Sequence, residues 1–154
     1  MKDFLTKLKW RLRGVKVWHY CNIYKTARIG GGTVVGSYTE IGPNVVIGKN
    51  CRIGAHCFIP EGVTIKDNCF IGPGTIFSND MYPPSTRALW VKTNVGPGAA
   101  LGAGVTVLPG AHIADKAMVG AGLTVVRALE EADLVYTGRN NVRAKEKRKC
   151  LQKY

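Results

Sequence analysis

The 154-residue sequence lacks several features that would each indicate a particular class of protein. It has no secretory segment and no apolar run long enough to span a bilayer, so we expect a cytoplasmic protein without disulfides. Its three histidines, His19, His56 and His112, and its five cysteines never show the clustered spacing of a zinc site. We therefore expect no metal.

Acidic residues are also scarce, with ten Asp and Glu against 22 Lys and Arg, which gives a formal net charge of +12. This excess lies at the two ends. Residues 1–16 carry six basic residues and one acid, and residues 138–154 carry seven and one, whereas the middle carries nine and eight. A nucleic-acid-binding face normally lies on the folded scaffold, so this distribution argues against nucleic acid as a partner.

A six-residue repeat fills the nearly neutral middle of the chain. Aliphatic residues recur at every sixth position, which matches neither the helical period of 3.6 nor the strand period of 2. They are Val17, Ile23, Ile29, Val35, Ile41, Ile47, Ile53, Ile59, Ile65, Ile71, Phe77 and then, in the same phase, Val95, Leu101, Val107, Ile113, Val119 and Val125. The position four residues later is usually small, and four of the five cysteines occupy it: Cys21, Cys51, Cys57 and Cys69. We interpret these cysteines as small buried side chains.

Three six-residue units close a triangular coil of about eighteen residues, and such coils stack with their strands in parallel. We therefore predict an all-β fold in which a parallel β-helix occupies residues 17–126. Residues 1–16 place Phe4, Leu5, Leu8, Leu12 and Val15 at helical spacing, which predicts an amphipathic helix. This helix either caps the first coil or contacts an anionic membrane surface. Residues 127–154 form a C-terminal segment, with one helical turn expected at 127–133, and a basic tail.

Two irregularities of the repeat point to function. Several outward-facing positions are apolar, and Phe58 and Ile76, eighteen residues apart, would stack in an exposed strip that we expect a homotrimer to bury. The repeat breaks after Phe77, where Pro83 and Pro84 cannot donate to a strand ladder. We predict an extruded loop at residues 78–88 and place the functional site there.

Three further segments accompany the repeat: the loop motif Asn79-Asp80-x-Tyr82-Pro83, the segment Ile71-Gly72-Pro73-Gly74, and the run from Val105-Thr106-Val107 to Val119-Gly120-Ala121-Gly122. Together they resemble the left-handed β-helix acyltransferases, most closely the N-acetyltransferases of nucleotide-linked 3-amino sugars. The resemblance implies a left-handed coil and acetyl-CoA as co-substrate, held between the subunits of a homotrimer. It also implies an acceptor that is a UDP- or dTDP-linked amino sugar used for surface-glycan biosynthesis.

The resemblance also suggests which residues hold acetyl-CoA. It places the donor to the thioester oxygen near Gly102 and Ala103, and the turn residues along the pantetheine arm at Ala103 and Ala121. The family also has a basic or polar cofactor-binding residue after the last regular coil, and the resemblance places it at Arg127. Arg143 lies in a segment that matches the family only loosely, because the Gly and Pro of the family motif are absent.

The loop indicates the kind of acceptor. Common sugar O-acetyltransferases with this repeat carry a loop histidine as general base, because a hydroxyl must lose its proton as it attacks. Here Asn79 stands in that region, and a neutral amine can attack without prior deprotonation, so we expect N-acetylation.

Most of the other candidate residues keep two readings each. Asp80 either accepts from the ammonium or caps the loop, and Tyr82 and Trp90 either stack on a ring or anchor the loop. Arg87 is a candidate substrate contact. His112 either acts near the thioester or is a surface histidine.

Two alternatives remain open. One is an O-acetyltransferase with His112 as base, and another is a catalytically silent scaffold. A metal-dependent hydratase is disfavoured, because its ligands would be three histidines and those of this chain lie on separate coils.

Overall fold

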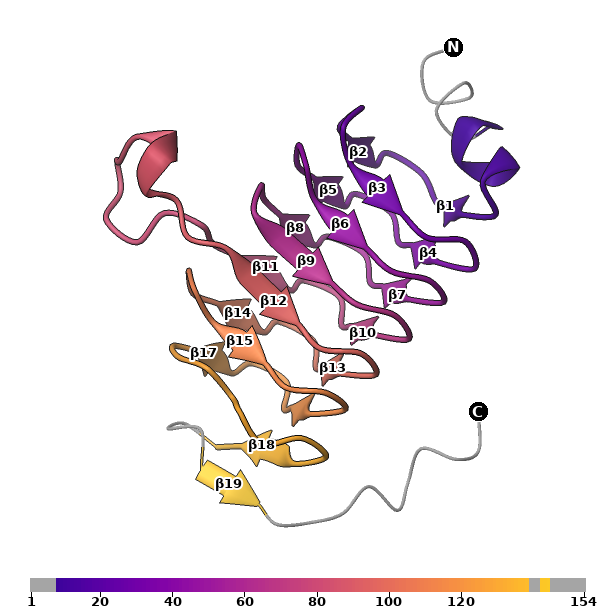
Figure 1. The fold of residues 1–154 in the computed structure, drawn as a ribbon. Helices are drawn as coiled ribbons and strands as arrows, with labels where there is room; N and C mark the ends of the chain where they lie inside the picture. Colours follow the sequence, from indigo (N-terminus) through magenta and orange to yellow (C-terminus); the bar gives the residue numbers. More distant parts are fainter. Residues whose placement is uncertain (1–7, 139–141, 145–154) are drawn as a thin grey trace.

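The computed structural model describes residues 8–138 and 142–144, which form a short helix at residues 8–12 and a column of stacked three-stranded coils (Figure 1). Sheet A contains, in order, β1 (Lys16–Val17), β4 (Val34–Val35), β7 (Arg52–Ile53), β10 (Phe70–Ile71), β13 (Ala100–Leu101), β16 (Met118–Val119), β18 (Val135–Thr137) and β19 (Val142–Ala144). Sheet B contains β2 (Asn22–Ile23), β5 (Glu40–Ile41), β8 (Phe58–Ile59), β11 (Ile76–Phe77), β14 (Thr106–Val107) and β17 (Thr124–Val125). Sheet C contains β3 (Arg28–Ile29), β6 (Val46–Ile47), β9 (Val63–Ile65), β12 (Thr93–Val95) and β15 (His112–Ile113).

Each coil gives one strand to each sheet, and neighbouring strands pair in parallel with the next coil. Lys16 pairs with Val34, for example, and Asn22 with Glu40, both at a separation of eighteen residues. The exception is β19, which pairs antiparallel with β18. This is a left-handed parallel β-helix, so the fold class predicted from the repeat and the resemblance is confirmed.

The repeat aliphatics fill the inside of the column. From Val35 to Val125 every one of them is buried, Ile71 and Leu101 completely. The small residues next to them join the coils. Thr33 and Thr39 donate hydroxyl hydrogen bonds of 2.8 and 2.9 Å to carbonyl oxygens of the next coil, and Cys51 donates its thiol to the Lys66 carbonyl at 3.1 Å. Cys51, Cys57 and Cys69 are buried, as the pattern predicted, whereas Cys21 is only half-buried.

One excursion leaves the column between sheets B and C. The chain departs after β11 and returns at Thr93, so residues 78–92 replace the short turn found here in other coils. The predicted loop 78–88 lies within this excursion, which also contains a 3-10 helix at Arg87–Leu89. The Val91 N–H donates to the Asn79 carbonyl at 2.8 Å, which joins the two ends of the excursion.

The N-terminal helix packs through a residue that the amphipathic pattern missed. Trp10 is 1% exposed against the first coil, with Lys9 and Arg13 over its ring. Leu8 and Leu12 are 43% and 81% exposed, so these two residues of the apolar pattern do not pack on the column. Phe4 and Leu5 lie outside the described residues. None of the helical residues in the described part of the chain forms a segment that could cross a bilayer.

The C-terminal end of the column also differs from expectation. No helical turn forms at residues 127–133; instead Leu129 bridges to Ile113, and β18 pairs with β16. The column therefore continues past residue 126 to Tyr136, which is buried. The spacing from Val125 to Leu129 is four residues and that from Leu129 to Tyr136 is seven, so the coil continues although the six-residue period is lost.

Two glycines of one turn make a test of coil stacking. A Cβ at Gly102 would stand 2.4 Å from the Ala121 backbone nitrogen, whereas a Cβ at Gly104 meets nothing within 4 Å. Gly104 has a φ of 66°, but the column accepts similar values at Asn50 and His56. We expect Gly102→Ala to lower the free energy of unfolding by about 3 kcal/mol through forced backbone separation. Gly104→Ala should cost only about 1 kcal/mol, from the left-handed conformation. Urea denaturation followed by circular dichroism measures both, and equal costs would contradict the stacking argument.

Candidate active site

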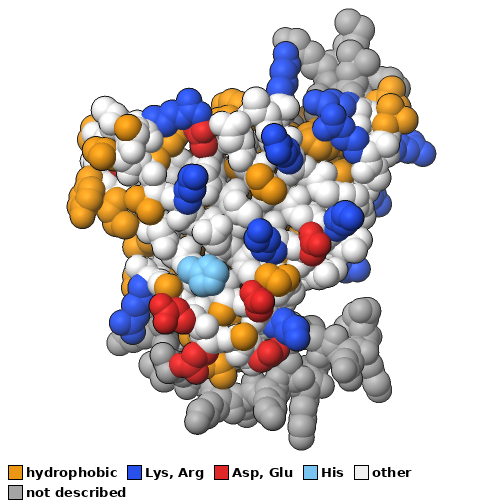
Figure 2. All heavy atoms as spheres, viewed as in Figure 1, with side chains coloured by type: hydrophobic (Ala, Val, Ile, Leu, Met, Phe, Trp, Pro, Cys, Tyr) orange, Lys and Arg blue, Asp and Glu red, His pale blue; other side chains and the backbone are white. Residues whose placement is uncertain are grey.

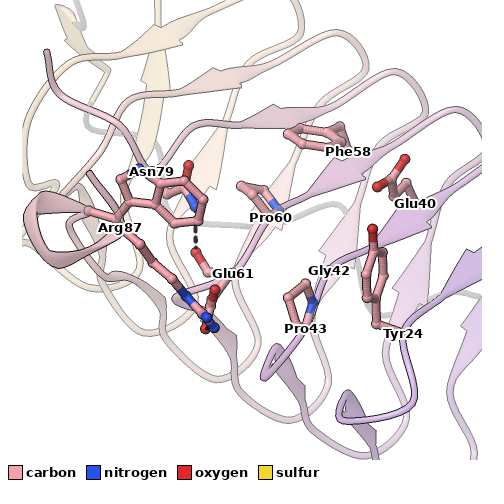
Figure 3. Close-up of a pocket in the computed structure, with 10 residues that line it drawn as sticks. Tyr24, Glu40, Gly42, Pro43, Phe58, Pro60, Glu61, Asn79 and Arg87 are labelled. Carbon is pink, nitrogen blue, oxygen red and sulfur yellow. Dashed lines mark hydrogen bonds and ion pairs between the residues drawn. The ribbon is translucent and has the colours of Figure 1, made fainter. Parts of the chain in front are cut away.

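A pocket of about 470 Å³ lies where the excursion meets sheet B and the turns between sheets B and C (Figure 3). Its lining comes from three sources: the outer face of sheet B, the B-to-C turns, and the excursion. The lining residues are Glu40 and Phe58 from the sheet, Tyr24, Gly42, Pro43, Pro60 and Glu61 from the turns, and Asn79, Arg87 and Trp90 from the excursion. Three of the residues predicted from the loop therefore share one cavity.

Asn79 stands at the base of the excursion and is held by both its backbone and its side chain. Its carbonyl accepts from Val91, and its Nδ2 donates to the Glu61 backbone carbonyl at 3.0 Å. Among the described residues, no donor reaches Asn79 Oδ1. The side chain is half-buried in the pocket wall, so it presents a fixed acceptor beside the cavity.

Glu61 ties the excursion to the coil beneath it. Its carboxylate forms an ion pair with Arg87 and accepts from Asn44 Nδ2 at 2.8 Å. The hydrogen bond from Arg87, and to a lesser extent that from Asn44, holds the pKa of Glu61 below its usual range. Glu61 in turn raises the pKa of Arg87. Arg87, predicted as a substrate contact, is thus already paired with a carboxylate of the pocket.

Asp80 organises the excursion from within. Its carboxylate accepts from the Ser85 hydroxyl at 2.6 Å, the Ser85 N–H at 2.9 Å and the Tyr82 N–H at 3.0 Å. These hydrogen bonds are those of a loop cap, which is one of the two readings of Asp80. Hydrogen bonding to the charged form, chiefly by Ser85, lowers the pKa of the Asp80 carboxyl.

The depressed pKa gives a test of this cap. Because the folded pKa lies below the unfolded one, the cap stabilises the loop fully above the unfolded value of about 3.9 and is lost as the pH falls through the folded pKa. We expect the NMR amide shifts of Tyr82 and Ser85 to titrate with a midpoint below about 3.9. Asp80→Asn should abolish this titration, and a midpoint at or above that value would contradict the cap.

The remaining predicted residues lie away from this pocket. Tyr82 is 79% exposed on the excursion and does not line the cavity. His112 is exposed on the outer face of sheet C, where β15 pairs with β12. The structure does not bring His112 together with Asn79, because they lie on different parts of the column.

Gly102, Ala103 and Ala121 lie along the opposite edge of sheet B, in the turns that join sheet A to sheet B. Gly72, Gly102 and Gly120 stack there in successive coils, and the sites of Cβ atoms at Gly104 and Gly122 are open. This gives the edge a bare backbone surface that could receive an extended, unbranched ligand. Within one chain, the edge and the pocket are separated by the width of sheet B.

The two predicted arginines lie at the C-terminal end. Arg127 is exposed after β17, on the edge between sheets B and C rather than beside Ala121. Arg143 belongs to β19 and pairs in register with Tyr136. In the described part of the chain no group of three His, Cys, Asp or Glu side chains is arranged to hold a metal ion.

The reading of the sequence missed the part of the pocket that comes from the coils. A usable signal existed, because Tyr24, Gly42 and Pro60 are spaced by the eighteen residues of one coil, and Glu61 precedes Asn79 by the same number. Counting back by coils from the loop would have identified these turn residues. Glu40 and Phe58 show the same spacing on the adjacent face.

Two family models match the repeats. The bacterial transferase hexapeptide model (six repeats) matches residues 26–61 and 44–79, and the model for the hexapeptide repeat of succinyl-transferase matches residues 92–127. The matched segments flank the excursion, which neither model covers in full. A comparison with curated protein sequences finds no match.

Solved structures with the same fold include three that are relevant to the site. A mutant of AntD, an N-acyltransferase from Bacillus cereus in complex with dTDP and coenzyme A, gives a TM-score of 0.75 at 20% identity over 88% of this chain and 82% of that one. A mutant of perosamine N-acetyltransferase from Caulobacter crescentus, in complex with CoA and GDP-perosamine, gives a TM-score of 0.73 at 22% identity over 95% of this chain and 67% of that one. The acetyltransferase domain of PglB from Neisseria gonorrhoeae, in complex with acetyl coenzyme A, gives a TM-score of 0.68 at 16% identity over 80% of this chain and 55% of that one.

This chain spans about two thirds of the length of the Caulobacter crescentus enzyme, with 66% covered in a second structure of it. At these identities the likeness establishes the fold. The strands, the stacked coils and the two repeat models agree with one another. The chain therefore contains hexapeptide repeats and has the same left-handed β-helix fold as these transferases.

Proposed function

We propose that the protein is an acetyl-CoA-dependent N-acetyltransferase that acts on the amino group of a nucleotide-linked sugar. The observation that carries the proposal is the pocket beneath the excursion, where the Asn79 amide, aromatic rings and carboxylates meet and no histidine is among the lining residues. Such a pocket lacks the histidine base expected for a hydroxyl acceptor, and a neutral amine does not require that base. The similar structures with CoA, dTDP and GDP-perosamine support the same chemistry.

The proposed roles follow from the geometry. The pocket receives the amino sugar, with Asn79 Oδ1 as a fixed acceptor for it. Acetyl-CoA lies along the edge formed by Gly102, Ala103 and Ala121, where a backbone N–H would donate to the thioester oxygen as negative charge develops. The amine forms the new C–N bond, the C–S bond breaks, and the leaving thiolate takes up the amine proton.

The separation of the two regions supports a homotrimer. If the edge of one subunit faces the excursion of the next, the two halves of the site meet between chains. The outward strip on sheet B, with Phe58 42% and Ile76 46% exposed, gives such an assembly an apolar surface to bury. A single-chain mass from light scattering on the purified protein would contradict this arrangement.

The surface charge is consistent with anionic substrates. On the face shown in Figure 2, Lys and Arg side chains spread over the N-terminal coils, and most of the acidic side chains gather over the C-terminal coils. A nucleotide diphosphate placed near the pocket would therefore approach the basic half of the column.

The exposed Leu8 and Leu12, with Lys9, Arg11 and Arg13, also suit weak contact of the N-terminal helix with an anionic membrane surface. Vesicle flotation of the chain with and without residues 1–14 tests that contact.

The direct experiment is an acetyl-transfer assay. The purified full chain is mixed with acetyl-CoA and UDP-, dTDP- or GDP-linked amino sugars, and thiol release is followed together with the mass of the product. We expect thiol release only with an amino sugar, and a product heavier by one acetyl group. Acetylation of the matching hydroxy sugar, lost in His112→Ala, would favour the O-acetyltransferase instead. No thermal stabilisation by CoA and no transfer would favour a scaffold.

A further inference from the structure

Glu40 stands out in the pocket because its carboxylate has no partner among the residues that the structure describes. It is the outward residue of β5, half-buried, and lies in register between Asn22 and Phe58 on the outer face of sheet B. Figure 3 shows its carboxylate next to the Tyr24 side chain at one end of the cavity. Among the described residues, none forms an ion pair or a side-chain hydrogen bond with it.

The other carboxylate of the pocket is fully engaged. Glu61 is 17% exposed at its side chain, paired with Arg87 and hydrogen-bonded by Asn44. The charges of Glu61 and Arg87 offset each other, so the uncompensated charge of the cavity is that of Glu40. A half-buried carboxylate without a partner favours a cationic ligand group and disfavours an anionic one.

The surroundings of Glu40 also favour a cation. Tyr24, Phe58 and Trp90 expose 44%, 42% and 37% of their surfaces, so rings line the same cavity as the carboxylate. Aromatic faces attract ammonium groups, and the effect adds to that of a nearby negative charge. A hydroxyl group in the same place would gain only an ordinary hydrogen bond.

We propose that Glu40 receives the ammonium group of the acceptor sugar and so makes the pocket select an amino sugar over its hydroxyl counterpart. This inference rests on the proposed function, because the ligand considered is the acceptor of that reaction. The ammonium group binds beside Glu40 and releases one proton to water before the amine attacks the thioester carbon. The C–N bond forms, the C–S bond breaks, and the second amine proton ends on the CoA thiol, so that one proton is released per turnover. Glu40 is thus a substrate contact that positions the nitrogen.

The experiment compares two ligands on three proteins. Isothermal titration calorimetry at neutral pH measures the dissociation constants of GDP-, UDP- or dTDP-linked amino sugars and of the same nucleotide sugars with a hydroxyl at that position. The proteins are the wild type, Glu40→Gln, and the matched control Glu130→Gln, which removes the same charge from an exposed residue at the far end of the column. We expect the wild type and the control to prefer the amino sugar at least tenfold, and Glu40→Gln to lose that preference while its affinity for the hydroxy sugar changes little.

The ratio of the two dissociation constants separates recognition from a structural effect, because a distorted pocket would weaken both ligands together. Glu40→Asp, which keeps the charge, should restore part of the preference. An unchanged ratio in Glu40→Gln, or equal loss of both ligands, would overturn the inference. The transfer assay decides the proposed function separately: a wild type that prefers the amino sugar but transfers no acetyl group would refute that function and leave the role of Glu40 in binding.

Discussion

Ile71→Ala should lower the free energy of unfolding by about 4 kcal/mol. Ile71 is fully buried inside the column and pairs in register with Ile53 of the preceding coil and Leu101 of the following one. Its truncation leaves a cavity between two coils that backbone hydrogen bonds hold at a fixed spacing, so collapse around the cavity is limited. Urea denaturation followed by circular dichroism measures the change.

The adjacent residue provides the control. Phe70 belongs to the same two-residue strand, but its side chain points outward and is 45% exposed. Phe70→Ala removes more atoms than Ile71→Ala does, yet we expect it to cost less than about 1 kcal/mol, because much of the removed surface already faces water. A larger loss for Phe70→Ala than for Ile71→Ala would show that the column is not stabilised mainly from within.

This contrast also explains why the sequence predicts the fold so well. Ile71 has an aliphatic equivalent in the preceding coil, eighteen residues earlier, and seventeen such positions recur with one spacing. All of them therefore predict the same coil geometry. The apolar pattern of a single coil would not predict the fold, but its repetition through the stack does. Where the spacing changes, as between Val125, Leu129 and Tyr136, the same physical coil continues and the pattern no longer detects it.

The N-terminal helix shows a second limit. Helical spacing selected Leu8 and Leu12, but the first coil needs one large flat side chain to cover its open end, and Trp10 supplies it. Hydrophobic periodicity cannot identify which face of a short helix meets a partner of unknown shape.

The sequence likewise predicts only part of the candidate site. The break in the repeat located Asn79, Arg87 and Trp90, because a loop in a regular column is visible in the sequence. The pocket floor was missed because Glu40 and Glu61 occupy ordinary outward and turn positions of the repeat. They become part of a site only when the excursion lies against the neighbouring coil, a tertiary contact that only the eighteen-residue spacing of the coils could have indicated.

Asn79→Ala should lower kcat/KM for acetyl transfer to the amino sugar by about 100-fold while changing stability little. The substitution removes the amide that reaches the Glu61 carbonyl and the free Oδ1 beside the cavity. The acceptor sugar then loses a fixed hydrogen-bond partner, and the wall of the pocket loses one tether to the coil. Steady-state kinetics of thiol release, with thermal melts of the same samples, measure both quantities.

Asn94→Ala is the matched control, because Asn94 is an exposed amide on the outer face of sheet C, in the strand that follows the excursion. It should keep wild-type kinetics. Asn79→Asp adds a sharper comparison: it retains the acceptor oxygen but removes the donor to the Glu61 carbonyl, and places a second negative charge near Glu61. If Oδ1 orients the acceptor sugar, Asn79→Asp should keep more activity than Asn79→Ala; if the tether to the coil matters more, the two should be equally impaired. Wild-type turnover in both variants would remove Asn79 from the reaction, and with it the placement of chemistry at the excursion.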